Sequence, residues 1–380
     1  MIIGILTLVP YDNYGGILQG YALQTVLERM GHKVYIYNTK LYNYKSLKFK
    51  AKMLVKWSLR KYVLHRKDES FLRPFSYEDY RVSELKPFIK KYIHLTRTFH
   101  NGTQDIYNFT KEAGIEVVVV GSDQTWRPGL SPDLYHLFGD FIPKDSPIKR
   151  IAYAASFGVD KLEYSPNQLD VCKPLLQRFK AVSVRETSGI ELCKKYFGVD
   201  AEWVLDPTML LDKEDYMQLI KNYQPIDKKI DFMQYVFFWD TYERKVIDKI
   251  ITILNTKPVN LFPERFLGEV KNKEELAMSK FKPLEEWLYG YANSKFVVTD
   301  SFHGTVFCII FNVPFIVVSP KAVTRFKTLL SLFGLEHRLV IKPEEVTEEL
   351  VNERIDWEKV NKKREELKKQ SMDFLRKALS

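Results

Sequence analysis

The residues with the clearest chemical potential lie in the segment Asp300-Ser301-Phe302-His303-Gly304-Thr305. This segment joins a predicted buried strand, residues 296–299, to a predicted helix, residues 305–311. Free amide groups at the start of a helix attract anions, phosphate above all. His303 at this turn could therefore donate a proton when an anionic substrate is bound. The alternative is a neutral histidine that hydrogen-bonds the backbone and fixes the turn.

Three cationic side chains could hold such an anion. Arg185 follows a predicted buried strand, residues 181–184, so its guanidinium is expected to emerge at the end of the strand, where its planar fork suits a carboxylate or phosphate. The alternative is an interdomain ion pair with Glu186 or a nearby acid. Arg325 lies one helical turn beyond Lys321, so both could point at the same site, or both could lie on an exposed helix face.

The carboxylates offer a second kind of chemistry. Asp123, in the turn Gly121-Ser122-Asp123-Gln124, could orient or deprotonate a hydroxyl group, or it could cap the turn. Asp206 precedes Pro207, and we expect a hinge or domain-joining turn there rather than a catalytic group. Asp300 is expected to hold the turn that presents His303.

These residues must be positioned by a regular alternation of short apolar strands and amphipathic helices. The strands lack polar alternation, as parallel strands covered on both faces do. The pattern predicts an α/β protein with two Rossmann-like, doubly wound domains that face each other across a cleft. We assign residues 1–195 to the first domain and 196–380 to the second, with the crossing inside 186–212 and a long surface helix from about Trp357. The predicted strands are 2–7, 34–37, 116–120, 150–154, 181–184, 232–238, 258–262, 296–299 and 315–318. The predicted helices outside the His303 segment are 17–30, 242–255, 284–292 and 321–333.

Ligands of open α/β sheets bind beyond the carboxyl ends of the strands. Polar and small residues follow six of the predicted strands at this edge, and together they predict a binding cleft. The cleft residues expected beside the charged groups are Asn13, Gly15, Gly16, Ser122, Gln124, Ser156, Ser301, Gly304 and Thr305.

The net charge of +10 on 380 residues could indicate nucleic-acid binding, but its distribution argues against it. Nine Lys or Arg and no acid lie between residues 41 and 67, which leaves +1 for the rest of the chain. Within this segment the spacing predicts a basic amphipathic helix. We favour an ordinary surface helix; the alternative is a peripheral membrane contact through residues 45–67 that would meet a lipid-linked substrate.

The remaining sequence features limit the class of protein. The cysteines Cys172, Cys193 and Cys308 cannot all pair and are expected to be buried thiols in a reducing compartment. The first residues do not have the pattern of a signal peptide, and no apolar run is long enough to span a membrane. We therefore expect a cytoplasmic protein, with the inner face of the cell membrane as the alternative location. The motifs of P-loop nucleotidases, zinc hydrolases, α/β-hydrolases and nicotinamide enzymes are absent.

The motifs in this order resemble those of the polysaccharide pyruvyl transferase family. The matching segments are residues 13–24, 121–126, 152–158, 182–186, 300–305 and 324–326. The resemblance implies a fold like that of GT-B glycosyltransferases, with the acceptor on the first domain and the donor on the second. It also implies phosphoenolpyruvate as co-substrate, no other cofactor, and a ketal-linked pyruvate on a saccharide of the cell surface or an exopolysaccharide. His303 is similar to the family's proposed general acid, and Arg185 resembles a donor-binding residue.

A mechanism follows as a hypothesis. Arg185, Arg325 and Lys321 hold the donor together with Ser301 and the helix start at Gly304-Thr305. His303 protonates the donor's methylene carbon, and Asp123 positions or deprotonates the attacking hydroxyl. No metal is required, since cationic side chains can supply the electrostatic stabilisation. The alternatives are a GT-B-type nucleotide-sugar glycosyltransferase and a non-catalytic saccharide-binding protein.

Overall fold

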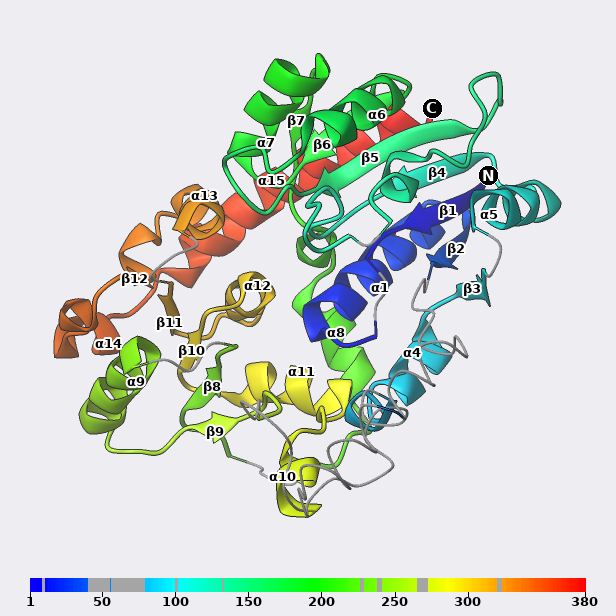
Figure 1. Cartoon of the computed structure of the whole chain (residues 1–380). Helices are drawn as coiled ribbons and strands as arrows, with labels where there is room; N and C mark the ends of the chain where they lie inside the picture. Colours follow the sequence, from blue (N-terminus) through cyan, green and yellow to red (C-terminus); the bar gives the residue numbers. More distant parts are fainter. Residues whose placement is uncertain are drawn as a thin grey trace.

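The computed structural model describes residues 1–8, 11–39, 55, 79–99, 102–131, 133–225, 229–237, 241–264, 273–319 and 323–380. These residues form two Rossmann-like α/β domains, each built on one parallel sheet (Figure 1). The predicted fold class is therefore confirmed.

The first domain is built on a seven-stranded sheet in the order β3-β2-β1-β4-β5-β6-β7, and all its strand pairs are parallel. The chain starts at β1, adds β2 and β3 on one side, and then crosses to β4 on the other. The strand order thus reverses between β1 and β4, which is where open α/β sheets bind ligands. The strands are β1 Ile2–Leu6, β2 Lys33–Asn38, β3 Leu95–Thr98, β4 Val117–Val120, β5 Lys149–Ala155, β6 Ala181–Val184 and β7 Glu202–Trp203. The α-helices of this part are α1 Tyr14–Arg29, α4 Lys86–Tyr92, α5 Gly102–Glu112, α6 Pro166–Leu176 and α7 Thr187–Leu192.

The second domain has a five-stranded parallel sheet in the order β12-β11-β10-β8-β9. Here the order reverses between β8 and β10, so the loop after β10 lies at the corresponding switch point. The strands are β8 Met233–Tyr235, β9 Val259–Asn260, β10 Val297–Thr299, β11 Phe315–Val318 and β12 Leu339–Val340. The α-helices are α8 Lys213–Ile220, α9 Thr241–Leu254, α10 Lys273–Met278, α11 Leu284–Asn293, α12 Phe302–Phe311, α13 Val323–Phe333, α14 Glu348–Asn352 and α15 Trp357–Leu379.

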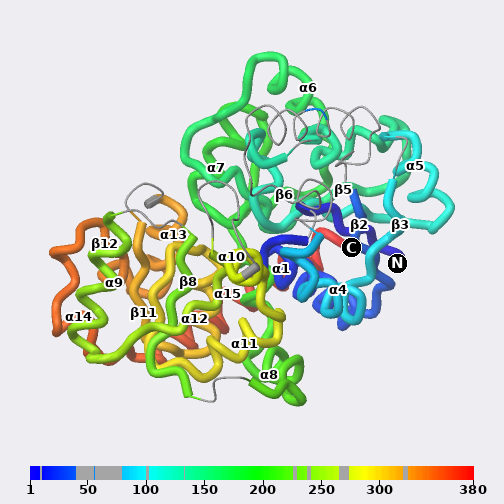
Figure 2. The backbone as a smooth tube through the Cα atoms, turned by 60° about the horizontal axis from the view of Figure 1, so that its bottom comes forward, coloured from blue at the N-terminus to red at the C-terminus, as the bar shows by residue number. Residues whose placement is uncertain are grey.

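The last helix, α15, returns from the second domain to the first, and both views show its end near the start of the chain (Figures 1 and 2). The ring of Phe374 packs against Tyr153 of β5, and the Ser371 hydroxyl accepts the Leu205 amide at 3.0 Å. This helix is the one predicted from about Trp357, but one of its faces is buried on the first domain. Strand β7 still belongs to the first sheet and lies inside the range 186–212 predicted for the crossing, and the domain boundary between residues 195 and 196 stays a prediction.

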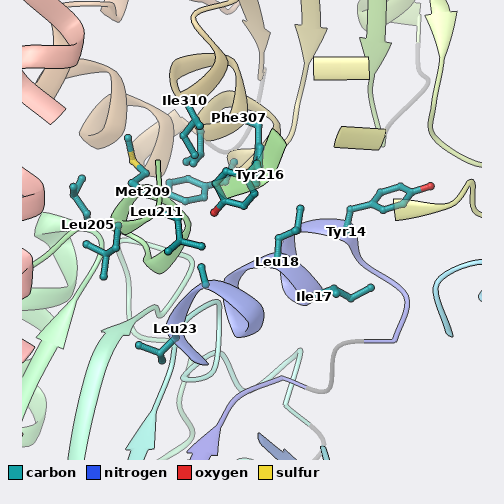
Figure 3. Packing of buried hydrophobic residues seen from close by; sticks show 14 of the residues in the cluster. Tyr14, Ile17, Leu18, Leu23, Leu205, Met209, Leu211, Tyr216, Phe307 and Ile310 are labelled. Atoms are coloured by element: carbon teal, nitrogen blue, oxygen red, sulfur yellow. The ribbon is translucent and has the colours of Figure 1, made fainter. Parts of the chain in front are cut away.

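One apolar core joins the two domains. It runs from α1 through the 3-10 turn Pro207–Leu210 to α8, α11 and α12. In Figure 3, Leu18 of α1, Leu211 and Tyr216 converge on Phe307 and Ile310 of α12. Separate cores fill the other face of each sheet. The segment around Asp206 is therefore packed inside the molecule and is not a free linker.

Each predicted strand overlaps an observed one, whereas two helix starts differ from the prediction. Helix α1 begins at Tyr14 and not at residue 17, because the Asn13 side chain accepts the Gly16 amide at 3.2 Å and caps the helix. Helix α12 begins at Phe302 and not at residue 305, because Ser301 caps it through the Gly304 amide at 3.2 Å. The expected loop glycines and His303 therefore lie in first helical turns. The short strands β3, β7 and β12 and helices α4 to α8, α10 and α14 lie outside the predicted elements.

Two predictions fall outside the described residues. Lys321 is one, and of the basic segment 45–67 the structure describes Val55 alone. In the part of the chain that is described, no helix is long and apolar enough to cross a membrane.

Candidate active site

The centre of the site is a buried ion cluster around Arg185. Its Nη2 donates to Asp123 Oδ1 at 3.1 Å, its Nε to Glu186 Oε1 at 3.1 Å and its Nη1 to Asp206 Oδ2 at 2.9 Å. Only 2% of the Arg185 side chain is exposed. Burial lowers the pKa of Arg185, but the three carboxylates more than offset that effect and raise it. The three acids and one guanidinium leave an excess of two negative charges.

Arg185 follows β6 at the carboxyl edge of the sheet, but its guanidinium is buried, and each kind of nitrogen in it donates to a carboxylate. Its role in donor binding stays a prediction. The ion pair with Glu186 is the contact that had been considered as the alternative, but it lies within the first domain and does not bridge the two. The contact of Arg185 with the second domain is a different one, because its guanidinium lies 4.3 Å from the ring centre of Phe302 at the start of α12.

The elements of the first sheet place this cluster at its carboxyl edge. Asp123 follows β4, Arg185 and Glu186 follow β6, and Asp206 follows β7. The turn after β4 needs a glycine, since Gly121 has φ +124° and a Cβ there would lie 2.1 Å from the Tyr153 carbonyl oxygen. Gln19 of α1 fixes the same turn by accepting the Ser122 amide at 3.0 Å.

Asp206 is the site residue that sequence reasoning missed. Its Oδ1 accepts the Thr208 amide at 3.1 Å and the Thr208 hydroxyl at 2.7 Å, and its Oδ2 accepts the Ser122 hydroxyl at 2.9 Å. Burial raises the pKa of Asp206, but the charges of His303 and Arg185 and the hydrogen bonds from Thr208 outweigh it and hold the pKa well below its usual range. The Asp-Pro pair indicated a turn and does form one. It gave no sign that the carboxylate points into the site.

His303 approaches this cluster from the second domain. It lies in the first turn of α12, its side chain is 7% exposed, and its Nε2 is 3.6 Å from Asp206 Oδ2. The other side of the ring lies against α1, because a Cβ on Gly15 would be only 2.2 Å from Nδ1. Gly16 brings the same turn near Asp123, whose Oδ2 would be 3.9 Å from a Cβ there. The first turns of α1 and α12 therefore meet at His303.

Arg325 of α13 is the second guanidinium near the cluster. It is half-buried, and its Nε has no hydrogen-bond partner among the described residues. Burial, followed by the positive charge of Arg185, lowers the pKa of Arg325. A buried guanidinium nitrogen without a partner is costly, so an anion there would be stabilised.

The remaining predicted residues form hydrogen bonds within the turns around the site. Ser156 donates to Glu186 Oε1 at 2.8 Å, and Thr305 donates to the Ser301 carbonyl at 3.0 Å. Asp300 accepts the Phe237 amide at 2.8 Å and so holds the turn before α12. Gln124 accepts a hydrogen bond from Arg127 at 3.1 Å at the edge of the site. In the described ranges no group of three or more His, Cys, Asp or Glu is placed to hold a metal ion, and the metal-free scheme stays a prediction.

A family model described as "Polysaccharide pyruvyl transferase" matches residues 13–321, which is most of the chain and includes every residue of the ion cluster as well as His303. The chain belongs to the polysaccharide pyruvyl transferase family. Membership in this family makes it a transferase with a donor and a saccharide acceptor, and the predicted family resemblance is confirmed.

The comparison with solved structures agrees with the fold. A putative UDP-N-acetylglucosamine 2-epimerase from Listeria monocytogenes matches with a TM-score of 0.50 and 11% identity over 97% of this chain and 91% of that one. The UDP complex of S. aureus MnaA has a TM-score of 0.49 and 11% identity over 96% of this chain and 91% of that one. Acinetobacter baumannii MurG has a TM-score of 0.43 and 11% identity over 99% of each chain. At 11% identity the likeness to the Listeria protein shows the fold alone, a GT-B-like pair of domains. No curated protein matches the sequence.

Proposed function

We propose that this member of the family transfers a pyruvyl group from phosphoenolpyruvate to two hydroxyls of a saccharide, as a ketal. The observation that carries the proposal is the meeting at His303 of two helix starts, one from each domain, beside the buried acids Asp123 and Asp206. A proton donor, two positive helix ends and carboxylates at one point suit a reaction that protonates an anionic donor and deprotonates a hydroxyl.

The donor's phosphate and carboxylate would bind at the start of α12, where Ser301, Gly304 and Thr305 lie, and at Arg325. The unpartnered Nε of Arg325 supports this assignment. Arg185 would act mainly through its charge, because its guanidinium already donates to three carboxylates. A role for Lys321 stays a prediction.

The chemistry needs four steps. His303 gives a proton to the methylene carbon of the donor, and positive charge develops at C2. One saccharide hydroxyl attacks C2 and loses its proton to Asp123. The C2–O bond to phosphate then breaks, and a second hydroxyl closes the ketal. The two saccharide hydroxyls release one proton each. One of these protons restores the proton that His303 gave to the methylene carbon, and the other leaves with phosphate.

The experiment follows phosphate release and product mass with phosphoenolpyruvate and a panel of saccharides. His303→Gln cannot donate a proton to carbon, so turnover should fall by ~10²-fold or more while the donor still binds. His136→Gln is the matched control, since His136 pairs with Asp140 in the first domain, outside the ion cluster. Near-normal turnover by His303→Gln would remove this residue from the mechanism.

The same assay separates the two alternatives. A nucleotide-sugar glycosyltransferase would form a glycosidic bond and leave phosphoenolpyruvate intact. A saccharide-binding protein would bind glycan equally well without His303 and release no phosphate. A lipid-linked acceptor, a membrane contact through residues 45–67 and a cytoplasmic location stay predictions.

A further inference from the structure

We propose that Asp206 is the positioning residue of His303: its carboxylate accepts a hydrogen bond from Nε2–H of the imidazole, so that Nδ1, on the side of Gly15, is the nitrogen that delivers the proton to the donor. This inference rests on the proposed function, in which His303 is the proton donor.

The carboxylate of Asp206 is held in one place. Oδ1 accepts two hydrogen bonds from Thr208, and Oδ2 accepts one from Ser122 and one from Arg185. Its side chain is fully buried, at 0% exposure. A group tied at both oxygens cannot follow a moving imidazole, so it acts as a fixed reference for the ring.

The imidazole of His303 has one acidic side chain beside its ring nitrogens in the described residues. Among the described residues, Asp206 is the only Asp or Glu within 4.0 Å of a His303 ring nitrogen. The separation of 3.6 Å exceeds a hydrogen bond, and Nε2 is buried with no other partner in the described part of the chain. Catalytic hydrogen bonds are often long before substrate binds and tighten in the complex. A small rotation of the ring would complete this one.

A carboxylate that accepts a hydrogen bond from one imidazole N–H fixes the tautomer and the orientation of the ring. If Nε2 faces Asp206, the proton for the donor must leave from Nδ1. That side of the ring lies against the backbone of α1, since a Cβ on Gly15 would be 2.2 Å from Nδ1, so the donor has to reach Nδ1 from beside this contact.

The charges around His303 fit this division of roles. Asp206 lies next to its Nε2, and Arg185 pairs with Asp206 and also with Asp123 and Glu186. Asp123 binds Arg185 through Oδ1, whereas its Oδ2 lies near the first turn of α1, 3.9 Å from a Cβ on Gly16, so Asp123 is the acid placed to act on a hydroxyl. Asp206 acts on the imidazole.

The test uses nitrogen-15 NMR of the histidine side chains in the full chain, with His303→Gln to identify the His303 signals. At alkaline pH the wild type should show the Nε2–H tautomer, and Asp206→Asn should lose it. The variant's kcat should fall by about 10²-fold or more, as when the carboxylate of a His–Asp pair is neutralised, while KM for phosphoenolpyruvate changes far less.

The control is Asp212→Asn, the same change in a carboxylate that pairs with Lys368 at 2.6 Å and lies away from His303. It should keep both the tautomer and kcat. If wild-type His303 carries its proton on Nδ1, or if Asp206→Asn leaves the nitrogen-15 shifts unchanged, the inference is overturned whatever the activity. The wild-type spectrum decides this even if Asp206→Asn fails to fold. Absence of phosphoenolpyruvate turnover in the wild type would instead contradict the proposed function.

Discussion

Replacing Gly15 with alanine should lower kcat strongly while the protein stays folded. A Cβ at this position would lie 2.2 Å from Nδ1, 2.3 Å from Cγ and 2.6 Å from Cβ of His303. The nearest contact falls about 1.2 Å short of ordinary van der Waals distance, which begins at 3.4 Å. Because the α1 backbone is fixed by the core, the imidazole must move by about that amount.

The effects on stability and activity differ in size. Overpacking costs about 1–3 kcal/mol, whereas alanine in place of glycine in a helix gains about 1 kcal/mol, so the free energy of unfolding should drop by at most ~2 kcal/mol. A displacement of about 1 Å in a catalytic group can cost ~10²-fold in rate. We therefore expect kcat to fall by about 10²-fold in a folded protein.

The assay pairs phosphate release with thermal unfolding. Gly20→Ala is the matched control in the same helix, because a Cβ there would meet only Ile36 Cδ1, at 3.4 Å. This variant should keep its activity and its stability. A Gly15→Ala protein as active as the wild type would show that the position of His303 against α1 does not matter for turnover.

Three further outcomes are expected. Arg185→Lys keeps one charge but cannot reach three carboxylates, so thermal stability should fall clearly; unchanged stability with weaker donor binding would favour the donor-binding role instead. The pKa of Asp206 is lowered in the folded protein, so its carboxylate stabilises the fold above the unfolded pKa of about 4, and this stability is lost as the pH falls further. Below about pH 4 the free energy of unfolding of the wild type should therefore drop faster than that of Asp206→Asn, by up to ~1.4 kcal/mol per pH unit. Parallel slopes for the two proteins would argue against the ion cluster. Burial raises the pKa of the Cys172 and Cys193 thiols to about 12 and that of Cys308 well above its usual value, so a thiol reagent at pH 8 should label none of them before unfolding, and fast labelling would contradict their burial.

The sequence alone was enough for the architecture, because parallel strands buried on both faces leave a strong local pattern. Runs such as Val117–Val120 and Phe315–Val318 are continuous and apolar, and each observed strand of this kind had been predicted. Strands of two residues, such as β7 and β12, leave no such pattern. The two helix starts were missed by three residues each, because the capping hydrogen bonds of Asn13 and Ser301 place Gly15 and His303 inside a helix and not in a loop.

The sequence also determined which loops gather at the site, since the carboxyl ends of parallel strands share one edge. It could not decide what each charged side chain does there. Arg185 and Asp206 are 21 residues apart, and His303 comes 97 residues after Asp206. Whether a guanidinium faces a ligand or three carboxylates depends on which groups the folded chain brings within hydrogen-bond distance. The distances between these groups are set by the packing of α1 and α12 around the segment at Asp206. This packing is a tertiary contact, so local sequence patterns do not predict it.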